Sequence, residues 1–124
     1  MKDIYNIYFP DKLLEIYKKC YRIKIGCSNR NDRIKILQSG YPGKLILLKK
    51  YKTNYIKDTI FKKIFSKYNE KNGGSKEFFV IPINELKYFR LVMNMIFEYY
   101  DNYKIDIIPS GWSIKELLNL LEQI

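Results

Sequence analysis

The stretch Tyr21–Pro42, YRIKIGCSNRNDRIKILQSGYP, decides the fold that we expect, because it carries the signals of a strand, a turn and a helix in succession. Residues 21–25 alternate strictly between apolar and basic side chains, which predicts a half-buried strand with a basic outer face. A basic helix should follow and end at Gly40. Its candidate caps are Ser28, Asn29 and Asn31. Its expected core-facing residues are Ile34, Ile36 and Leu37.

Further segments complete the front half of the chain. Residues 3–9 are β-branched and aromatic, which predicts a strand, and residues 11–19 have the spacing of a short helical turn or of a strand. Residues 44–50 form an apolar run with lysine ends, which predicts a central strand covered on both faces. Helical spacing over 54–68 predicts a helix with Asn54 as a cap.

The back half of the chain begins with a short strand and ends with a helix. We expect strands over 77–82 and 104–109, separated by a long amphipathic helix over 84–100. Ser113 and Glu116 have the spacing of a capping box at the start of an acidic and apolar helix, which should either close the core or contact a partner. The order of elements therefore predicts an α/β (α+β) domain, a small sheet flanked by helices.

The charge of the chain indicates an anionic partner. Lys and Arg number 23 against 13 Asp and Glu, a net charge of +10, and the chain also has 12 tyrosines and 7 phenylalanines. This combination is typical of proteins that bind nucleic acids. The alternative is that the Lys, Ile, Asn and Tyr content reflects AT-rich coding, in which case much of the basic charge is solvated surface.

Several classes of protein and of site are disfavoured. No stretch approaches the roughly 18 apolar residues of a membrane span, and the N-terminus has no signal-peptide pattern, so we expect a soluble intracellular protein, cytoplasmic or nuclear, without a membrane partner. The chain has no histidine and only Cys20 and Cys27, which excludes a four-ligand Cys/His zinc site. Tyr, Lys, Asp and Glu remain for acid-base chemistry.

Four short motifs in order carry a resemblance to a known family. They are KIG at Lys24–Gly26, an arginine at Arg33, LQSGYP at Leu37–Pro42 and SKEFF at Ser75–Phe79. Together they resemble the GIY-YIG nuclease superfamily, and more closely its phage branch, the Orf-172 DNA-binding domain. The resemblance implies a mainly antiparallel central sheet in a core of residues 1–82, with 83–124 as a helical extension packed on the same domain. It also suggests a viral or phage origin.

The resemblance implies a site for phosphodiester hydrolysis. In the family a tyrosine activates water and a helix arginine offsets the charge of the phosphate. Carried over by position, Arg33 is the arginine, Tyr8 is the first choice for the tyrosine, and Tyr5 is the alternative. Lys24 takes the place of the second motif's tyrosine, where it could contact phosphate.

The family also uses a divalent cation, Mg²⁺ or another, held by a carboxylate. Asp58 and Glu77 both match acidic positions, and the residues alone do not decide between them. Lys62 stands where the branch has a histidine, a departure that weakens the case for cleavage. The residues that the sequence nominates for nucleic-acid contact are Lys24, Arg30, Arg33, Lys35 and Lys62.

Three functions follow as alternatives. The first is a DNA-binding domain with metal-dependent endonuclease activity, and the second is a binding module that has lost cleavage, with DNA as the expected partner and RNA as another. The third is a viral or host protein-interaction protein, in which the C-terminal helix mediates a partner contact or self-association.

Overall fold

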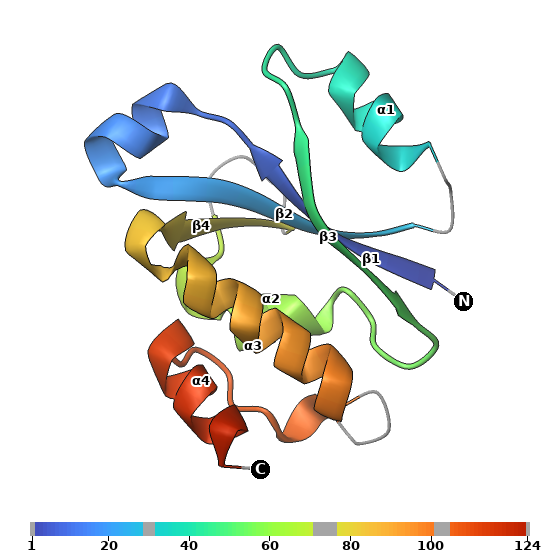
Figure 1. The fold of residues 1–124 in the computed structure, drawn as a ribbon, viewed down its shortest axis with the longest axis vertical. Helices are drawn as coiled ribbons and strands as arrows, with labels where there is room; N and C mark the ends of the chain where they lie inside the picture. Colours follow the sequence, from blue (N-terminus) through green and yellow to red (C-terminus); the bar gives the residue numbers. More distant parts are fainter. Residues whose placement is uncertain (1, 29–31, 71–76, 101–104, 124) are drawn as a thin grey trace.

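The computed structural model describes residues 2–28, 32–70, 77–100 and 105–123 (Figure 1). The elements in chain order are β1 (Lys2–Phe9), the π-helical turn η1 (Leu14–Lys18), β2 (Cys20–Ser28), α1 (Arg33–Ser39), β3 (Ile46–Thr53), α2 (Ile60–Ile64), the 3₁₀ turn η2 (Ser66–Tyr68), β4 (Phe78–Pro82), the 3₁₀ turn η3 (Ile83–Glu85), α3 (Leu86–Tyr99), the 3₁₀ turn η4 (Ile105–Ile107) and α4 (Ile114–Glu122). The expected α+β class, an antiparallel sheet flanked by helices, is confirmed.

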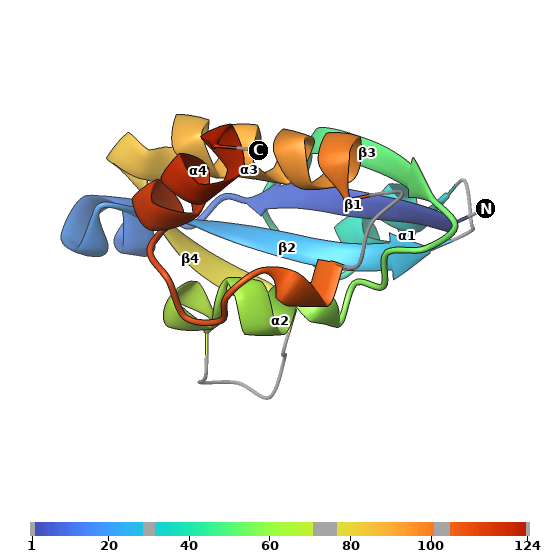
Figure 2. The same ribbon diagram turned by 90° about the horizontal axis from the view of Figure 1, so that it is seen from below.

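The four strands form one sheet in the order β3-β1-β2-β4, and every neighbouring pair is antiparallel. Because successive residues of a strand point to opposite faces, the sheet has two distinct faces. On one face, here called the α1 face, Tyr5, Ile7 and Phe9 pack against side chains of α1. The other, the α3 face, is covered by α2, α3 and α4, as Figures 1 and 2 show.

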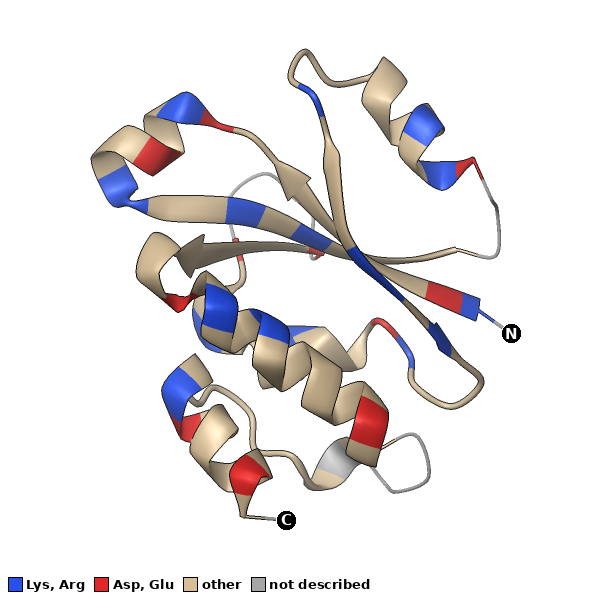
Figure 3. Cartoon of the chain, in the orientation of Figure 1, with Lys and Arg blue, Asp and Glu red and all other residues tan. Residues whose placement is uncertain are grey.

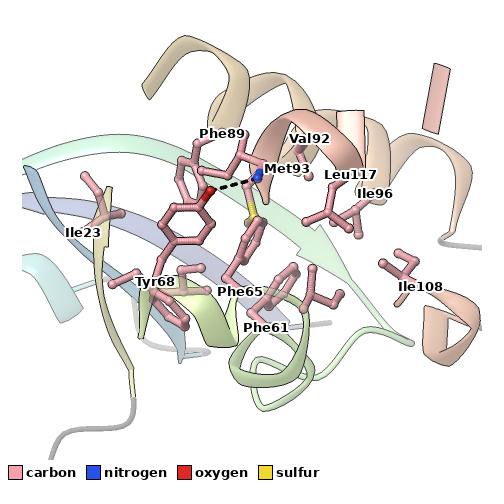
Figure 4. Close-up of a cluster of buried hydrophobic side chains, with 14 of the residues drawn as sticks. Ile23, Phe61, Phe65, Tyr68, Phe89, Val92, Met93, Ile96, Ile108 and Leu117 are labelled. Carbon is pink, nitrogen blue, oxygen red and sulfur yellow. Dashed lines mark hydrogen bonds between the residues drawn. The ribbon is translucent and has the colours of Figure 1, made fainter. Parts of the chain in front are cut away.

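The main core lies on the α3 face. Phe61, Phe65 and Phe89 are fully buried and lie in one cluster with Met93 and Leu117 (Figure 4). This cluster draws on strands from the front half and on α3 and α4 from the back half, so residues 83–124 share a core with residues 1–82. The expected capping box at Ser113 and Glu116 is present, and α4 closes the core.

Three predicted elements are wrong. The strand expected over 44–50 is β3, which is an edge strand and not a central one, so Ile46 and Leu47 remain exposed. The strand expected over 104–109 is a 3₁₀ turn, in which the Ile108 N–H donates to the Ile105 carbonyl and Ile108 packs into the core. The helix expected over 54–68 is shorter at both ends.

The shortening of that helix has a local cause at its N-terminus. The Thr53 hydroxyl accepts hydrogen bonds from the backbone N–H groups of Tyr55 at 3.2 Å and Ile56 at 3.0 Å. Side chains of this kind offer the backbone an alternative to helical hydrogen bonds. Asn54 is therefore part of a turn, and α2 begins only at Ile60.

Helix α1 matches its predicted range but not its predicted cap. Its N-cap residue is Asp32, which makes no side-chain capping bond, while Ser28 belongs to β2 and Asn29 and Asn31 lie outside the described residues. The helix ends at Gly40 as expected. Ile34 and Leu37 face the core, whereas Ile36 is exposed because α1 is covered by the sheet on one side only.

Candidate nucleic-acid interface

Lys24 is buried and ion-paired, which corrects the expectation of a basic outer face on its strand. It lies on the α1 face between Ile7 and Phe78, and its Nζ is 2.7 Å from Glu77 Oε2 and 5.0 Å from the centre of the Phe78 ring. Its aliphatic stem passes over Gly26, where an added Cβ would lie 3.4 Å from Lys24 Cε. The Lys24 ammonium is therefore buried and paired with the Glu77 carboxylate.

Arg22 is the other basic residue of the expected outer face, and it is also neutralised. Its guanidinium bonds both Glu70 oxygens, at 2.8 and 3.2 Å, and reaches Asp11 Oδ2 at 2.6 Å. Bonding to Glu70 is the main cause that raises the pKa of Arg22, while the Leu14 backbone N–H and Arg22 lower the pKa of Asp11. This network ties the β1–β2 hairpin to the segment before β4.

The two candidate tyrosines lie on opposite faces of the sheet. Tyr8, the first choice from sequence, packs on the α3 face and donates a hydrogen bond of 2.6 Å to Glu15 Oε2. Tyr5, the alternative, lies on the α1 face with Lys24. The reason is the period of the strand: residues three positions apart in β1 point in opposite directions. The structure thus brings Tyr5, and not Tyr8, onto the face that carries Lys24 and Arg33.

Arg33 lies within electrostatic reach of Tyr5 at the start of α1. Burial raises the pKa of the Tyr5 phenol, and the neighbouring Asp3 carboxylate adds to the rise, whereas Arg33 acts in the opposite direction. Burial and Glu15 raise the pKa of Tyr8 still further. Neither phenol is poised to lose a proton near neutral pH, which is what activation of water requires.

Two lysines of β3 join this neighbourhood, and the sequence did not nominate them. Lys50 is the register partner of Tyr5, and Lys52 is the partner of Asp3, with Lys52 Nζ 3.8 Å from Asp3 Oδ1. Tyr51 and Thr53 are buried on the α3 face, so the alternating residues Lys50 and Lys52 point to the α1 face. Both lysines are exposed, and Figure 3 shows that β3 is rich in basic residues.

We call Arg33, Lys50 and Lys52 the basic cluster. All three flank the buried pair of Asp3 and Tyr5 at one end of the α1 face. Among the other nominated contacts, Lys35 is exposed on α1, two residues from Arg33 and therefore on a different side of the helix. Arg30 lies outside the described residues.

The two candidate metal ligands meet in one pocket. Asp58 and Glu77 line a small cavity of about 50 Å³ together with Lys62, Ile25 and Phe79. A divalent cation needs carboxylate oxygens that are available to it. Here Glu77 Oε2 already accepts from the buried Lys24 ammonium, and in the part of the chain that the structure describes no three Cys, Asp or Glu side chains cluster as a metal site. The ion pair with Lys24 therefore competes with any divalent cation for the Glu77 carboxylate.

Comparisons with known proteins found no family model, curated protein or solved structure that matches the chain. Within the described ranges, no helix is both long and apolar enough to cross a membrane. Function is therefore inferred from the residues and their placement.

Proposed function

We propose that the chain binds the phosphate backbone of a nucleic acid, DNA in the first place, through the basic cluster, and that it does not cleave it. The observation that carries this proposal is the convergence of Arg33, Lys50 and Lys52 on one end of the α1 face. A net charge of +10 adds long-range attraction for a polyanion.

The chemistry of the basic cluster suits phosphate. A guanidinium forms paired hydrogen bonds with phosphate oxygens, and an ammonium acts as a mobile point charge. Lys50 and Lys52 lie two residues apart on one face of a strand, a separation of about 7 Å, so both can reach one stretch of backbone. Such contacts hold the polymer without reading its sequence.

A GIY-YIG-like core is part of the same proposal. It is supported by a β1–β2 hairpin that carries Lys24–Gly26 within β2, by a following helix that starts at Arg33, and by Glu77 directly before β4. In this core the catalytic parts are altered. The Glu77 carboxylate forms an ion pair with Lys24. Tyr5, the candidate tyrosine on the α1 face, keeps its proton because the pKa of its phenol is raised.

Binding is tested by the affinity of fluorescently labelled single- and double-stranded DNA and RNA, measured by anisotropy. Arg33→Ala should weaken binding to DNA by about 5- to 10-fold, the effect of one lost phosphate contact. The matched control is Lys115→Ala, which removes one exposed charge from α4. Equal losses in the two variants would show that only net charge matters and would refute the basic cluster.

Cleavage, the alternative, is tested with supercoiled and single-stranded DNA in the presence of Mg²⁺ or Mn²⁺. We expect no nicking by the wild-type chain above that of Arg33→Ala. Cleavage that is lost in both Arg33→Ala and Glu77→Gln would instead establish an endonuclease at this site.

A further inference from the structure

The tip of the β1–β2 hairpin exposes three large apolar side chains. Leu13, Ile16 and Tyr17 are 68%, 60% and 76% exposed. They lie within five consecutive residues, in and directly before η1. Figures 1 and 2 show that this turn projects from the end of the sheet, on the side where α3 begins, and Glu15 of the turn and Leu86 of α3 line one pocket.

The tip is rigidly built. Asp11 Oδ1 accepts a hydrogen bond from the Leu14 N–H at 3.1 Å, and Glu15 Oε2 accepts from the Asp11 N–H at 3.0 Å and from the Tyr8 hydroxyl at 2.6 Å. The Arg22 guanidinium holds Asp11 from the strand. The apolar side chains are thus held outward by a satisfied polar network behind them, and their exposure is a fixed property of the hairpin.

The exposed charged side chains at the tip are all positive. Lys12, Lys18 and Lys19 are exposed around the three apolar side chains, while the two acidic residues, Asp11 and Glu15, are taken up by the network described above. Figure 3 shows basic residues at both ends of the turn. The tip is therefore a projecting apolar surface surrounded by lysines, and we call Leu13, Ile16 and Tyr17 the knob.

We propose that this knob inserts into the surface of an anionic lipid bilayer. Apolar side chains enter the boundary between headgroups and acyl chains, and lysines gain attraction from anionic headgroups. Two other partners are less favourable. A second copy of the chain would bring two groups of lysines together, and a nucleic-acid backbone would leave Leu13 and Ile16 in water. A convex knob also needs no preformed groove when its partner is fluid. The sequence predicts no membrane partner, from the lack of a spanning segment and of a signal peptide, and the proposed peripheral contact departs from that prediction.

Vesicle sedimentation tests the proposal, with one set of vesicles of phosphatidylcholine alone and another containing phosphatidylserine. The wild-type chain should bind only the second set. Leu13→Ser with Ile16→Ser should reduce partitioning by about tenfold or more. The matched control is Leu91→Ser with Ile107→Ser, which removes one exposed leucine and one exposed isoleucine elsewhere. No binding by the wild-type chain, or equal binding by both double variants, overturns the proposal.

A second readout separates insertion from attraction by other lysines. Tyr17→Trp, in a chain that also carries Trp112→Phe, should show a blue-shifted emission on phosphatidylserine vesicles and quenching by brominated acyl chains. Sedimentation without either change would place the contact elsewhere and overturn the proposal. The proposal would also be overturned if Leu13→Ser with Ile16→Ser lost affinity for DNA but not for vesicles. That result would leave the role of the basic cluster to its own test with Arg33→Ala.

Discussion

Glu77→Gln should destabilise the chain because it leaves the ammonium of Lys24 without its partner. The Lys24 side chain is 9% exposed and that of Glu77 is 40% exposed, with 2.7 Å between Nζ and Oε2. At this distance two unit charges attract by roughly 6 kcal/mol at an effective dielectric constant of about 20. Desolvation of Lys24 offsets much of that attraction, and removal of one partner from a fully buried pair costs about 3–5 kcal/mol.

Because water reaches Glu77, we expect a smaller loss, about 2–3 kcal/mol in the free energy of unfolding. For a domain of this size that corresponds to a fall of about 10 °C in Tm. Lys24→Met removes the buried charge and keeps the length of the stem over Gly26. Combined with Glu77→Gln, it should restore most of the lost stability, since no unpaired charge remains.

The assay is urea unfolding followed by circular dichroism, for the wild-type chain, both single variants and the double variant. The reasoning would be refuted if Glu77→Gln unfolded at the wild-type midpoint. It would also fail if the double variant were no more stable than Glu77→Gln, because Lys24 would then not be a buried charge that depends on Glu77.

Three further outcomes follow from the packing of the chain. Burial raises the pKa of Tyr51 to about 12. The stability due to its neutral form is therefore complete below the ordinary phenol pKa of about 10 and is lost as the pH rises toward 12. Over that interval the free energy of unfolding of Tyr51→Phe should fall less than that of the wild-type chain, and parallel curves of unfolding free energy against pH would contradict this. Tyr68→Phe removes the hydroxyl that accepts from the buried Ile114 N–H at 2.9 Å and should cost about 1–3 kcal/mol, measured by urea unfolding; a wild-type midpoint would argue against that bond. Ser113→Ala removes the cap of α4 and should cost about 1 kcal/mol, with Ser110→Ala, an exposed serine outside the helix, as its control.

The parts of the fold that could be predicted are those set by local patterns. Strict alternation over 21–25 correctly placed Tyr21, Ile23 and Ile25 on one face of β2. The spacing of Ser113 and Glu116 gave the capping box of α4. In each case the residues that decide the structure lie within one or two turns or strand repeats of one another.

The order and register of strands could not be predicted, because they depend on pairing between distant residues. Nothing in the apolar run before Lys49 shows that β3 lies at an edge, and nothing in YRIKI shows that a carboxylate more than fifty residues away covers Lys24. The choice between Tyr5 and Tyr8 likewise depends on which of them shares a face with Lys24. Of the candidate site, Arg33 could be nominated from sequence, whereas Lys50 and Lys52 required the register of β3 on β1.

The placement of Lys24 changes the chemistry that this site is expected to support. With Lys24 at Glu77 and a protonated Tyr5 beneath the basic cluster, the residues favour holding a phosphate over transferring one. In the proposed function the half-buried Arg33 and the exposed Lys50 and Lys52 would hold the phosphate, while the pair of Lys24 and Glu77 joins β2 to the residue before β4.

The central claim is tested most directly by the salt dependence of DNA affinity in two variants of equal net charge. Lys50→Ala with Lys52→Ala removes two proposed phosphate contacts, and Lys63→Ala with Lys115→Ala removes two exposed lysines from α2 and α4. The first variant should lower the slope of log affinity against log salt by about two, and the second should leave it close to that of the wild-type chain. Identical slopes in the two variants would contradict the account.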